Sequence, residues 1–418
     1  MGATFSDYRA ALSAPGAAAP VCASALGRLP IAMYSLAVLL YVREAHGSYA
    51  VAGAVSAAAL VGVATGMVAQ GRLLDRLGPT RPLLLIAAVY LLLAAGLVVA
   101  IEARAPLAVL AVVAFGTGAA GPALEGASRA LWSELVPAGR RLEAALTYEA
   151  ISLETFFILG PALAAILVTT TPWPGTALVV AAVLDAGGTV WFALTPAVRR
   201  RSARIRTARA AGPRTPSGDA LLGVIRRPGL QTVALASFGF GLVAGTAEVG
   251  VLAASAHAGA PAAGGVLLSA WSVVSVLAGI GYGMRPWPRA LHLRMPVLLG
   301  GFGVLVAVMG LVSPSGSLVW LGLVMILAGA LITPQTTAHS LGVELTAPAS
   351  AATEAFNWVV TAAVLGVSGG QSLAGVCVDR LGPAGYAVGG GLGALVAVLL
   401  WIRRHGVARA ASAREAMA

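Results

Sequence analysis

Long apolar runs separated by short polar loops recur along the whole chain. Each run is about 20 residues long, which is the length that an α-helix needs to cross the hydrocarbon core of a bilayer. Proline and glycine inside the runs do not oppose this prediction, because membrane helices tolerate both. We therefore predict an all-α membrane protein with twelve transmembrane helices, over residues 20–42, 50–71, 82–101, 107–130, 144–168, 175–195, 229–255, 263–284, 296–312, 318–340, 351–376 and 384–402.

The longest polar stretch, 196–228, divides the predicted spans six and six. It is rich in Arg, Pro and Ser and has little apolar periodicity, so we expect a flexible cytoplasmic linker along the membrane surface. Its charge has two interpretations, a topology signal or a lipid-specific regulatory site. The predicted domains are an N-terminal six-helix half (1–195), this linker, a C-terminal six-helix half (229–402) and a cytoplasmic tail (403–418).

The two predicted halves share a sequence pattern. Residues 131–135 and 341–345 both read Leu-x-x-Glu-Leu, and each is followed by a Pro, a Glu-Ala pair and a helix centre that contains Gly. Two related six-helix halves are the architecture of many secondary transporters. Small residues such as Gly62 and Gly66 in the second span would let neighbouring helix backbones approach closely.

Composition and charge agree with a membrane protein and predict its orientation. The 418 residues are 58% hydrophobic and 10% charged, with a mean hydropathy of +0.88, whereas a soluble domain carries about 25% charged residues. The net charge is +11, and all 27 basic residues are Arg. These Arg gather in alternate loops, as membrane topology requires and nucleic-acid binding does not. The loops on the other side carry only Arg43, Arg104 and Arg380. We therefore expect a multi-pass protein of the inner (plasma) membrane with both termini in the cytoplasm.

The sequence also argues against several kinds of chemistry. Cys22 and Cys377 lie far apart, and neither they nor the five His have a spacing typical of a metal site or a disulfide framework. A chain without Lys cannot form the Lys-containing phosphate loop of ATP-driven pumps. The N-terminal residues lack the pattern of a cleaved signal peptide. We expect no cofactor, no metal and no enzymatic activity.

The polar loop between the second and third predicted spans carries a motif. It reads GRLLDRLGPTRP over residues 71–82 and resembles the signature of the major facilitator superfamily, roughly Gly-x-Leu-x-Asp-Arg-x-Gly followed by basic residues. The motif residues here are Gly71, Asp75, Arg76, Gly78 and, one step later than usual, Arg81. The resemblance covers nearly the whole chain and implies the twelve-helix major facilitator fold, with Asp75 acting as a latch on the cytoplasmic side.

Two further features qualify this resemblance. In the fifth predicted span, Gly160 and Pro161 resemble the Gly-Pro motif of drug–proton antiporters within the superfamily, which implies export, and a Pro can bend this helix. The loop equivalent to the signature in the second half, residues 283–294, has no carboxylate, so we expect a latch on one side only.

Several ionisable residues fall inside the predicted spans, where each costs roughly 2.5–3.5 kcal/mol near mid-membrane and usually faces a cavity or a partner. Glu125 and Arg129 are four apart and can pair on one helix face, as a structural or a functional ion pair. Arg28 needs a carboxylate partner, for which Glu125 and Glu154 are the candidates. Further candidates for intramembrane partners are Glu149, Asp185 and His339.

Glu154 is the preferred proton-carrying group, and Glu248 and Glu125 are the alternatives. A carboxylate in an apolar wall takes up a proton more readily than one in water, which suits proton binding and release. Glu149 is five residues from Glu154, about 140° around the helix, so the two do not face one cavity. Candidates for lining the substrate cavity are Tyr34, Tyr148, Trp271, Asn357 and Trp358.

The first functional hypothesis is a secondary transporter that exports amphipathic small molecules, such as drugs or metabolites, in exchange for protons. Importing a small polar nutrient on the same fold is the second, and a non-transporting membrane receptor or scaffold is the third. The resemblance implies that the partners are a small-molecule substrate, protons and the lipid bilayer, with no nucleic acid. A monomer is expected, because each chain encloses its own pathway.

Overall fold

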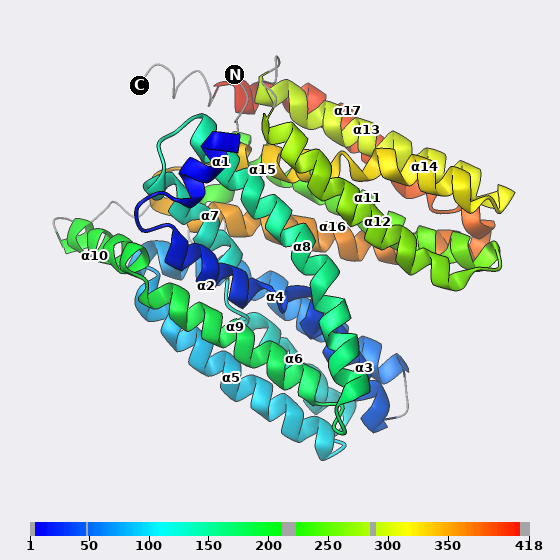
Figure 1. The fold of residues 1–418 in the computed structure, drawn as a ribbon, viewed down its shortest axis with the longest axis horizontal. Coiled ribbons are helices and arrows are strands. Elements are labelled where there is room, and N and C mark those ends of the chain that lie inside the picture. The colour runs from blue at the N-terminus through cyan, green and yellow to red at the C-terminus, as the bar shows by residue number, and fades with distance from the viewer. Residues whose placement is uncertain (1–4, 47–48, 211–222, 285–289, 410–418) are drawn as a thin grey trace.

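A computed structural model describes residues 5–46, 49–210, 223–284 and 290–409, and within these ranges the chain is helical and has no strand. Figure 1 shows the helices as a long, mostly aligned bundle. They are α1 (Phe5–Leu12), α2 (Ala18–Arg28), α3 (Ile31–His46), α4 (Tyr49–Leu77), α5 (Thr80–Glu102), α6 (Leu107–Ala120), α7 (Leu124–Leu135), α8 (Arg140–Thr170), α9 (Thr176–Leu194), α10 (Pro196–Ala210), α11 (Pro228–His257), α12 (Pro261–Met284), α13 (Leu291–Val312), α14 (Leu318–Gly329), α15 (Ile332–Thr346), α16 (Ala352–Leu381) and α17 (Ala387–Arg403).

Ten stretches of the described residues are helical, long and apolar enough to cross a membrane, or eleven if the bent pair within residues 18–46 counts as one span. Three predicted spans are each formed by two helices, with breaks between α2 and α3, between α6 and α7, and between α14 and α15. Two of the breaks coincide with Pro30 and Pro122, which cannot donate a backbone hydrogen bond. We expected these prolines to lie within continuous helices, and the breaks were not predicted.

The helices pack in two groups that are contiguous in sequence. In the first, α3 packs on α8, α5 on α9 and α4 on α6; in the second, α11 packs on α16 and α13 on α17. Glycines allow the closest crossings, as expected for Gly62 and Gly66: a Cβ atom at either position would lie 2.1 Å from a backbone oxygen of α6. We call these groups the first bundle (α2–α9) and the second bundle (α11–α17).

Two helices, α16 and α8, carry most of the packing between the bundles in the described part of the chain. Helix α16 packs on α4 and α7, and α8 packs on α12 and α15. Toward the end that carries α10 and both chain termini the bundles are in contact, and away from it the ribbons of α8 and α12 diverge (Figure 1). We call the end with the termini the closed end.

The Arg-rich connection between the bundles is more ordered than its composition suggests. We expected a flexible linker over 196–228, but residues Pro196–Ala210 form α10, which packs against α4, α5 and α9. Proline is well suited to the first helical position, and Ala and Arg are strong helix formers. Four residues of α10 are buried: Ala197, Val198, Arg201 and Ser202. The expectation of flexibility is wrong for α10, and residues 211–222 lie outside the described residues.

Candidate functional site

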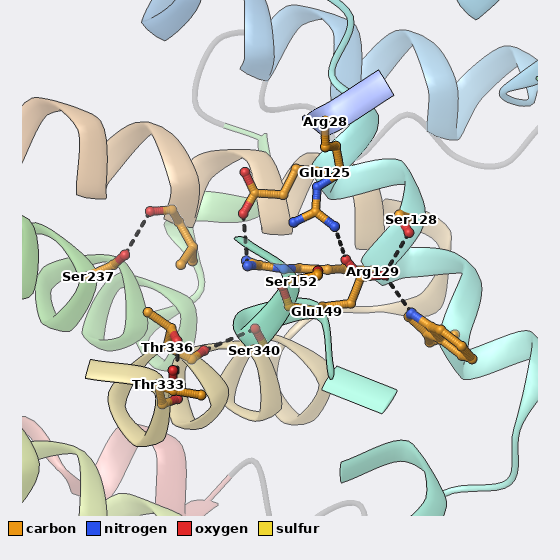
Figure 2. A network of polar contacts seen from close by, with 12 residues as sticks. Arg28, Glu125, Ser128, Arg129, Glu149, Ser152, Ser237, Thr333, Thr336 and Ser340 are labelled. Atoms are coloured by element: carbon orange, nitrogen blue, oxygen red, sulfur yellow. Dashed lines mark hydrogen bonds and ion pairs between the residues drawn. The ribbon is translucent and has the colours of Figure 1, made fainter. Parts of the chain in front are cut away.

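A buried polar network lies where the two bundles meet (Figure 2). Its residues come from the end of α2, from α7 and α8, and from α15 in the second bundle. Helix α7 begins beside this network because the α6–α7 break is held open by Gln70 of α4. The Gln70 amide donates to the carbonyl oxygens of Ala119 and Gly121 at 2.9 and 2.8 Å, and its oxygen accepts the backbone N–H of Ala123 at 2.9 Å.

Glu149 is the centre of the first part of the network. Its carboxylate forms an ion pair with Arg28 and accepts hydrogen bonds from Ser128 Oγ at 2.8 Å and Trp132 Nε1 at 2.7 Å. Arg28 and Glu149 are only 4% and 1% exposed. The prediction that Arg28 pairs with Glu125 or Glu154 is therefore wrong, because the crossing of α2 and α8 brings Arg28 to Glu149 instead.

Arg129 forms the second part of the network. Its Nη2 lies 2.8 Å from Glu125 Oε1, as the four-residue spacing predicts, and both side chains are buried. From the second bundle, His339 lies close enough to Arg129 to feel its charge, and its ring bonds to Gln335 at 2.9 Å. The network thus brings together two cations, Arg28 and Arg129, and two anions, Glu125 and Glu149, beside the buried His339.

Glu154 and Glu248 lie on opposite bundles, on α8 and α11, and interact electrostatically with one another. Gln371 of α16 donates a hydrogen bond of 2.9 Å to Glu248. Within the part of the chain that the structure describes, neither carboxylate has a cationic partner among the recorded ion pairs. Glu154 therefore takes no part in the Arg28–Glu149 ion pair.

Asp185 lies elsewhere, inside the first bundle. Its carboxylate accepts a hydrogen bond of 3.4 Å from Thr189 on the same helix, α9, and it is near the phenol groups of Tyr34 and Tyr90. Among the described residues no ion pair involves Asp185, so its predicted role as an intramembrane charge partner has no support in this geometry.

The signature motif lies at the closed end, against the first turn of α16. The sequence predicts a loop over residues 71–82, but residues 71–77 are the last turns of α4 and Thr80 begins α5, so only Gly78 and Pro79 connect the two helices. Asp75, 7% exposed, accepts hydrogen bonds from the backbone N–H groups of Thr353 at 3.3 Å and Glu354 at 2.8 Å. A carboxylate is favoured there, because the first turn of a helix has unpaired N–H groups and a partial positive charge. Gly71 allows the approach, since a Cβ atom there would lie 2.8 Å from Glu354 Cα, and Gly78 turns the chain with a φ of +80°.

Four charged residues of this contact are not among the predicted site residues: Arg72, Glu134, Arg201 and Glu354. Arg72 Nε lies 2.8 Å from Glu354 Oε1 across the bundles. Arg201 of α10 lies 3.8 Å from Asp75 and 2.9 Å from Glu134. The motif residues Arg76 and Arg81, by contrast, are exposed. The resemblance pointed to Asp75 but not to its partners, because Arg201 and Glu354 come from segments far away in sequence.

The equivalent position on the other side of the closed end also has an ion pair. Arg294 of α13 lies 3.8 Å from Glu143 near the start of α8, and it donates to the hydroxyl of Tyr282 at 2.9 Å. The loop 283–294 lacks a carboxylate, and α8 supplies Glu143 to this side of the closed end, so the latch on one side only stays a prediction. Residues 285–289 of this loop lie outside the described residues.

The predicted cavity residues are distributed over different environments. Asn357 is fully buried and donates to the carbonyl oxygen of Met67 at 2.6 Å, and Trp358 donates to Glu354 at 3.3 Å, so both belong to the contact at the closed end. Trp271 packs on Phe302 inside the second bundle.

The other two predicted cavity residues belong to the first bundle. Tyr34 packs on Tyr90 inside it, with ring centroids 6.3 Å apart. Tyr148 packs edge-on against Trp132, next to the central network, with centroids 6.5 Å apart. Of the five candidates, Tyr148 alone thus contacts a residue of that network in the described part of the chain.

The Gly-Pro motif lies within α8, which continues through both residues. At Gly160 a Cβ atom would lie 3.0 Å from the backbone nitrogen of Met33, so this glycine lets α8 approach the break between α2 and α3.

Comparisons with known proteins agree with this architecture. The crystal structure of the human organic anion transporter MFSD10 (TETRAN) matches at a TM-score of 0.69 and 16% identity, over 92% of this chain and 99% of that one. A bacterial homologue of the iron transporter ferroportin in an outward-facing state matches at a TM-score of 0.70 and 14% identity, over 93% and 98%. FucP in its outward conformation matches at a TM-score of 0.60 and 15% identity, over 92% and 98%.

No curated protein matches the sequence. These structural likenesses show the fold, and a sequence model of the Major Facilitator Superfamily matches residues 21–355. The chain is therefore a multi-pass membrane protein with a transporter fold, and it belongs to the Major Facilitator Superfamily.

Proposed function

We propose that the protein is a proton-coupled secondary transporter that exports amphipathic small molecules by alternating access. In this proposal twelve spans form two related six-helix halves, with α8 as the span that completes the count. The corresponding packing of α3 on α8 and α11 on α16, and of α5 on α9 and α13 on α17, supports two related halves. The bundles rock about the central network and expose it to one side of the membrane at a time.

The observation that carries the coupling is the position of Glu154 opposite Glu248. Two carboxylates that interact across the meeting line of the bundles, without a cation beside them in the described residues, repel one another when both are charged. Uptake of a proton by Glu154 removes this repulsion and lets the bundles close around it. Release of that proton on the cytoplasmic side restores the repulsion and returns the transporter to its outward-facing state.

The contacts at the closed end support the direction of access. The Arg bias of the loops predicts that this end is cytoplasmic, and Asp75, Arg72 and Glu354 hold it shut. In this orientation the structure is outward-facing, as are the solved ferroportin homologue and FucP. Opening of this contact is then the step that admits a substrate from the cytoplasm.

Everted membrane vesicles that contain the protein test the proposal. The vesicles are energised to an acid interior, and a panel of cationic, neutral and anionic amphipathic compounds is added while proton leak is recorded. We expect leak with some compounds, and its loss in Glu154→Gln but not in Glu44→Gln, an exposed acid on α3 that serves as the matched control. Leak that survives Glu154→Gln contradicts the role of Glu154 and moves the proton site to Glu248 or Glu125. Absence of leak with every compound, from folded protein, contradicts the proposed export and favours import or a non-transporting role.

A further inference from the structure

Both arginines of the central network have donors to spare. Arg28 uses one nitrogen for Glu149 and Arg129 uses one for Glu125. Within the described part of the chain, Arg28 Nε and Nη2 and Arg129 Nε are buried and have no hydrogen-bond partner. Buried donors without acceptors are rare in folded proteins, so these three N–H groups are a feature that needs an explanation.

Arg129 lies near the start of a short helix. It is on the second turn of α7, which begins after the break at Pro122. The N-terminus of a helix carries a partial positive charge. In discontinuous membrane helices such ends point at anionic groups of substrates. The break before α7 thus lies within two turns of Arg129, in the same buried network as Arg28.

The local carboxylates do not satisfy the arginines fully. Glu149 is already shared by Arg28, Ser128 and Trp132, and Glu125 pairs with Arg129 on its own helix. A planar guanidinium can bind two oxygens of an acid at once, and its Nε and one Nη form such a pair of donors. On Arg28 these are the two nitrogens that remain unpaired.

Apolar rings lie next to the charged groups. The guanidinium of Arg28 is 5.7 Å from the centroid of the Phe156 ring, and Phe240 of the second bundle packs edge-on against His339 at 6.0 Å. A ligand bound here would therefore meet N–H groups that can donate hydrogen bonds to an oxyanion on one side, and aromatic rings on the other. Those are the recognition elements for an amphipathic acid.

We infer that the central network is the binding site for the carboxylate of an amphipathic organic acid, held by the free donors of Arg28 and Arg129. This inference rests on the proposed function and names the substrate class of the same transporter. Both arginines are more than nine-tenths buried in the present conformation. The acid therefore reaches them when the bundles move, and it takes the place of the missing acceptors.

Equilibrium binding to the purified full-length protein in detergent tests the inference. The probes are 1-naphthaleneacetate, dodecanoate and cholate, each beside its neutral amide, with ethidium as a cation, and the method is titration calorimetry. We expect at least one acid to bind ten times more tightly than its amide. Arg129→Gln should weaken that acid at least tenfold and leave its amide within twofold. Arg76→Gln, an exposed arginine outside the network, is the control.

Arg28→Lys keeps the test valid if other changes at this position prevent folding. Lysine retains the charge that faces Glu149 but removes the two free donors of Arg28, so acid binding should again weaken while the protein stays folded. Amides or ethidium binding as tightly as every acid would overturn the inference. Acid binding that is unchanged in both arginine variants would overturn it as well.

The vesicle assay separates this inference from the proposed function. Proton leak driven by cationic or neutral compounds, with no binding of any acid, overturns the substrate class and leaves the proton-coupled transporter standing. Acid binding that depends on Arg28 and Arg129, in protein that shows no leak, supports the site and contradicts the proposed coupling instead.

Discussion

Asp75 Oδ2 at the end of α4 accepts a hydrogen bond of 2.8 Å from the backbone N–H of Glu354 at the start of α16. This bond joins the two bundles at the closed end and depends on the charge of a single side chain. Asp75 and Glu354 are 279 residues apart in the sequence.

Asp75→Asn should loosen the closed end. The amide keeps the size of the side chain but loses the charge that the first turn of α16 favours, and a hydrogen bond to a charged group contributes about 1.5–3 kcal/mol. We expect the distance distribution between spin labels at Arg76 and Ser350, both exposed, to gain a longer component. An unchanged distribution would contradict the role of Asp75 as a latch.

Gly71→Ala should weaken the same contact by steric overlap. The new Cβ atom would lie 2.8 Å from Glu354 Cα, closer than packed atoms tolerate, so α4 and α16 must separate. Gly96→Ala is the matched control, because a Cβ atom there would be 4.0 Å from its nearest neighbour, Val113. Thermal unfolding of the purified variants should show a lower Tm for Gly71→Ala than for Gly96→Ala, and equal Tm values would contradict the prediction.

Glu149→Gln should destabilise the protein strongly. Removal of one partner from a buried ion pair leaves an uncompensated charge and costs about 3–5 kcal/mol, and Arg28 is 4% exposed. The double variant Arg28→Met, Glu149→Gln should recover part of the loss, because no buried charge is left unpaired. Chemical denaturation of all variants checks this; a double variant less stable than Glu149→Gln alone would contradict the account.

Gln70→Ala should disturb the start of α7. Three hydrogen bonds of 2.8–2.9 Å hold the break between α6 and α7, and their loss leaves buried backbone groups unpaired. Each such group costs about 1–3 kcal/mol. We expect a lower Tm than for Gln231→Ala, whose amide makes one long bond of 3.4 Å to Arg403. Binding of the organic acids should fall in Gln70→Ala as well, because Arg129 lies on α7.

The alternation of apolar runs and Arg-rich loops predicted the helical membrane fold, and the Asp75 motif predicted the family. The partner of Arg28 could not be predicted in the same way. The sequence places Glu125, Glu149 and Glu154 all inside predicted spans, so each is a possible partner of Arg28. Only the crossing of α2 with α8 decides that Glu149 forms the ion pair. The orientation of packed membrane helices is set by neighbouring helices, which a single sequence does not reveal.

The helix breaks and α10 escaped prediction for other physical reasons. Proline is compatible with both a continuous and a broken membrane helix, and the side chain that stabilises one break, Gln70, lies some fifty residues away. Helix α10 has only a short apolar stripe, because its buried side combines Ala197 and Val198 with Arg201 and Ser202, which make polar contacts. Periodicity of apolar residues therefore could not indicate it.

The docking of α10 makes this helix part of the first bundle. Ser202 bonds to the backbone of Thr80, and Arg201 pairs with Glu134, so α10 moves with α5 and α7. Arg201 also lies 3.8 Å from Asp75. When Asp75 leaves the first turn of α16, its carboxylate therefore keeps a cationic neighbour, and the open state does not leave a buried charge alone.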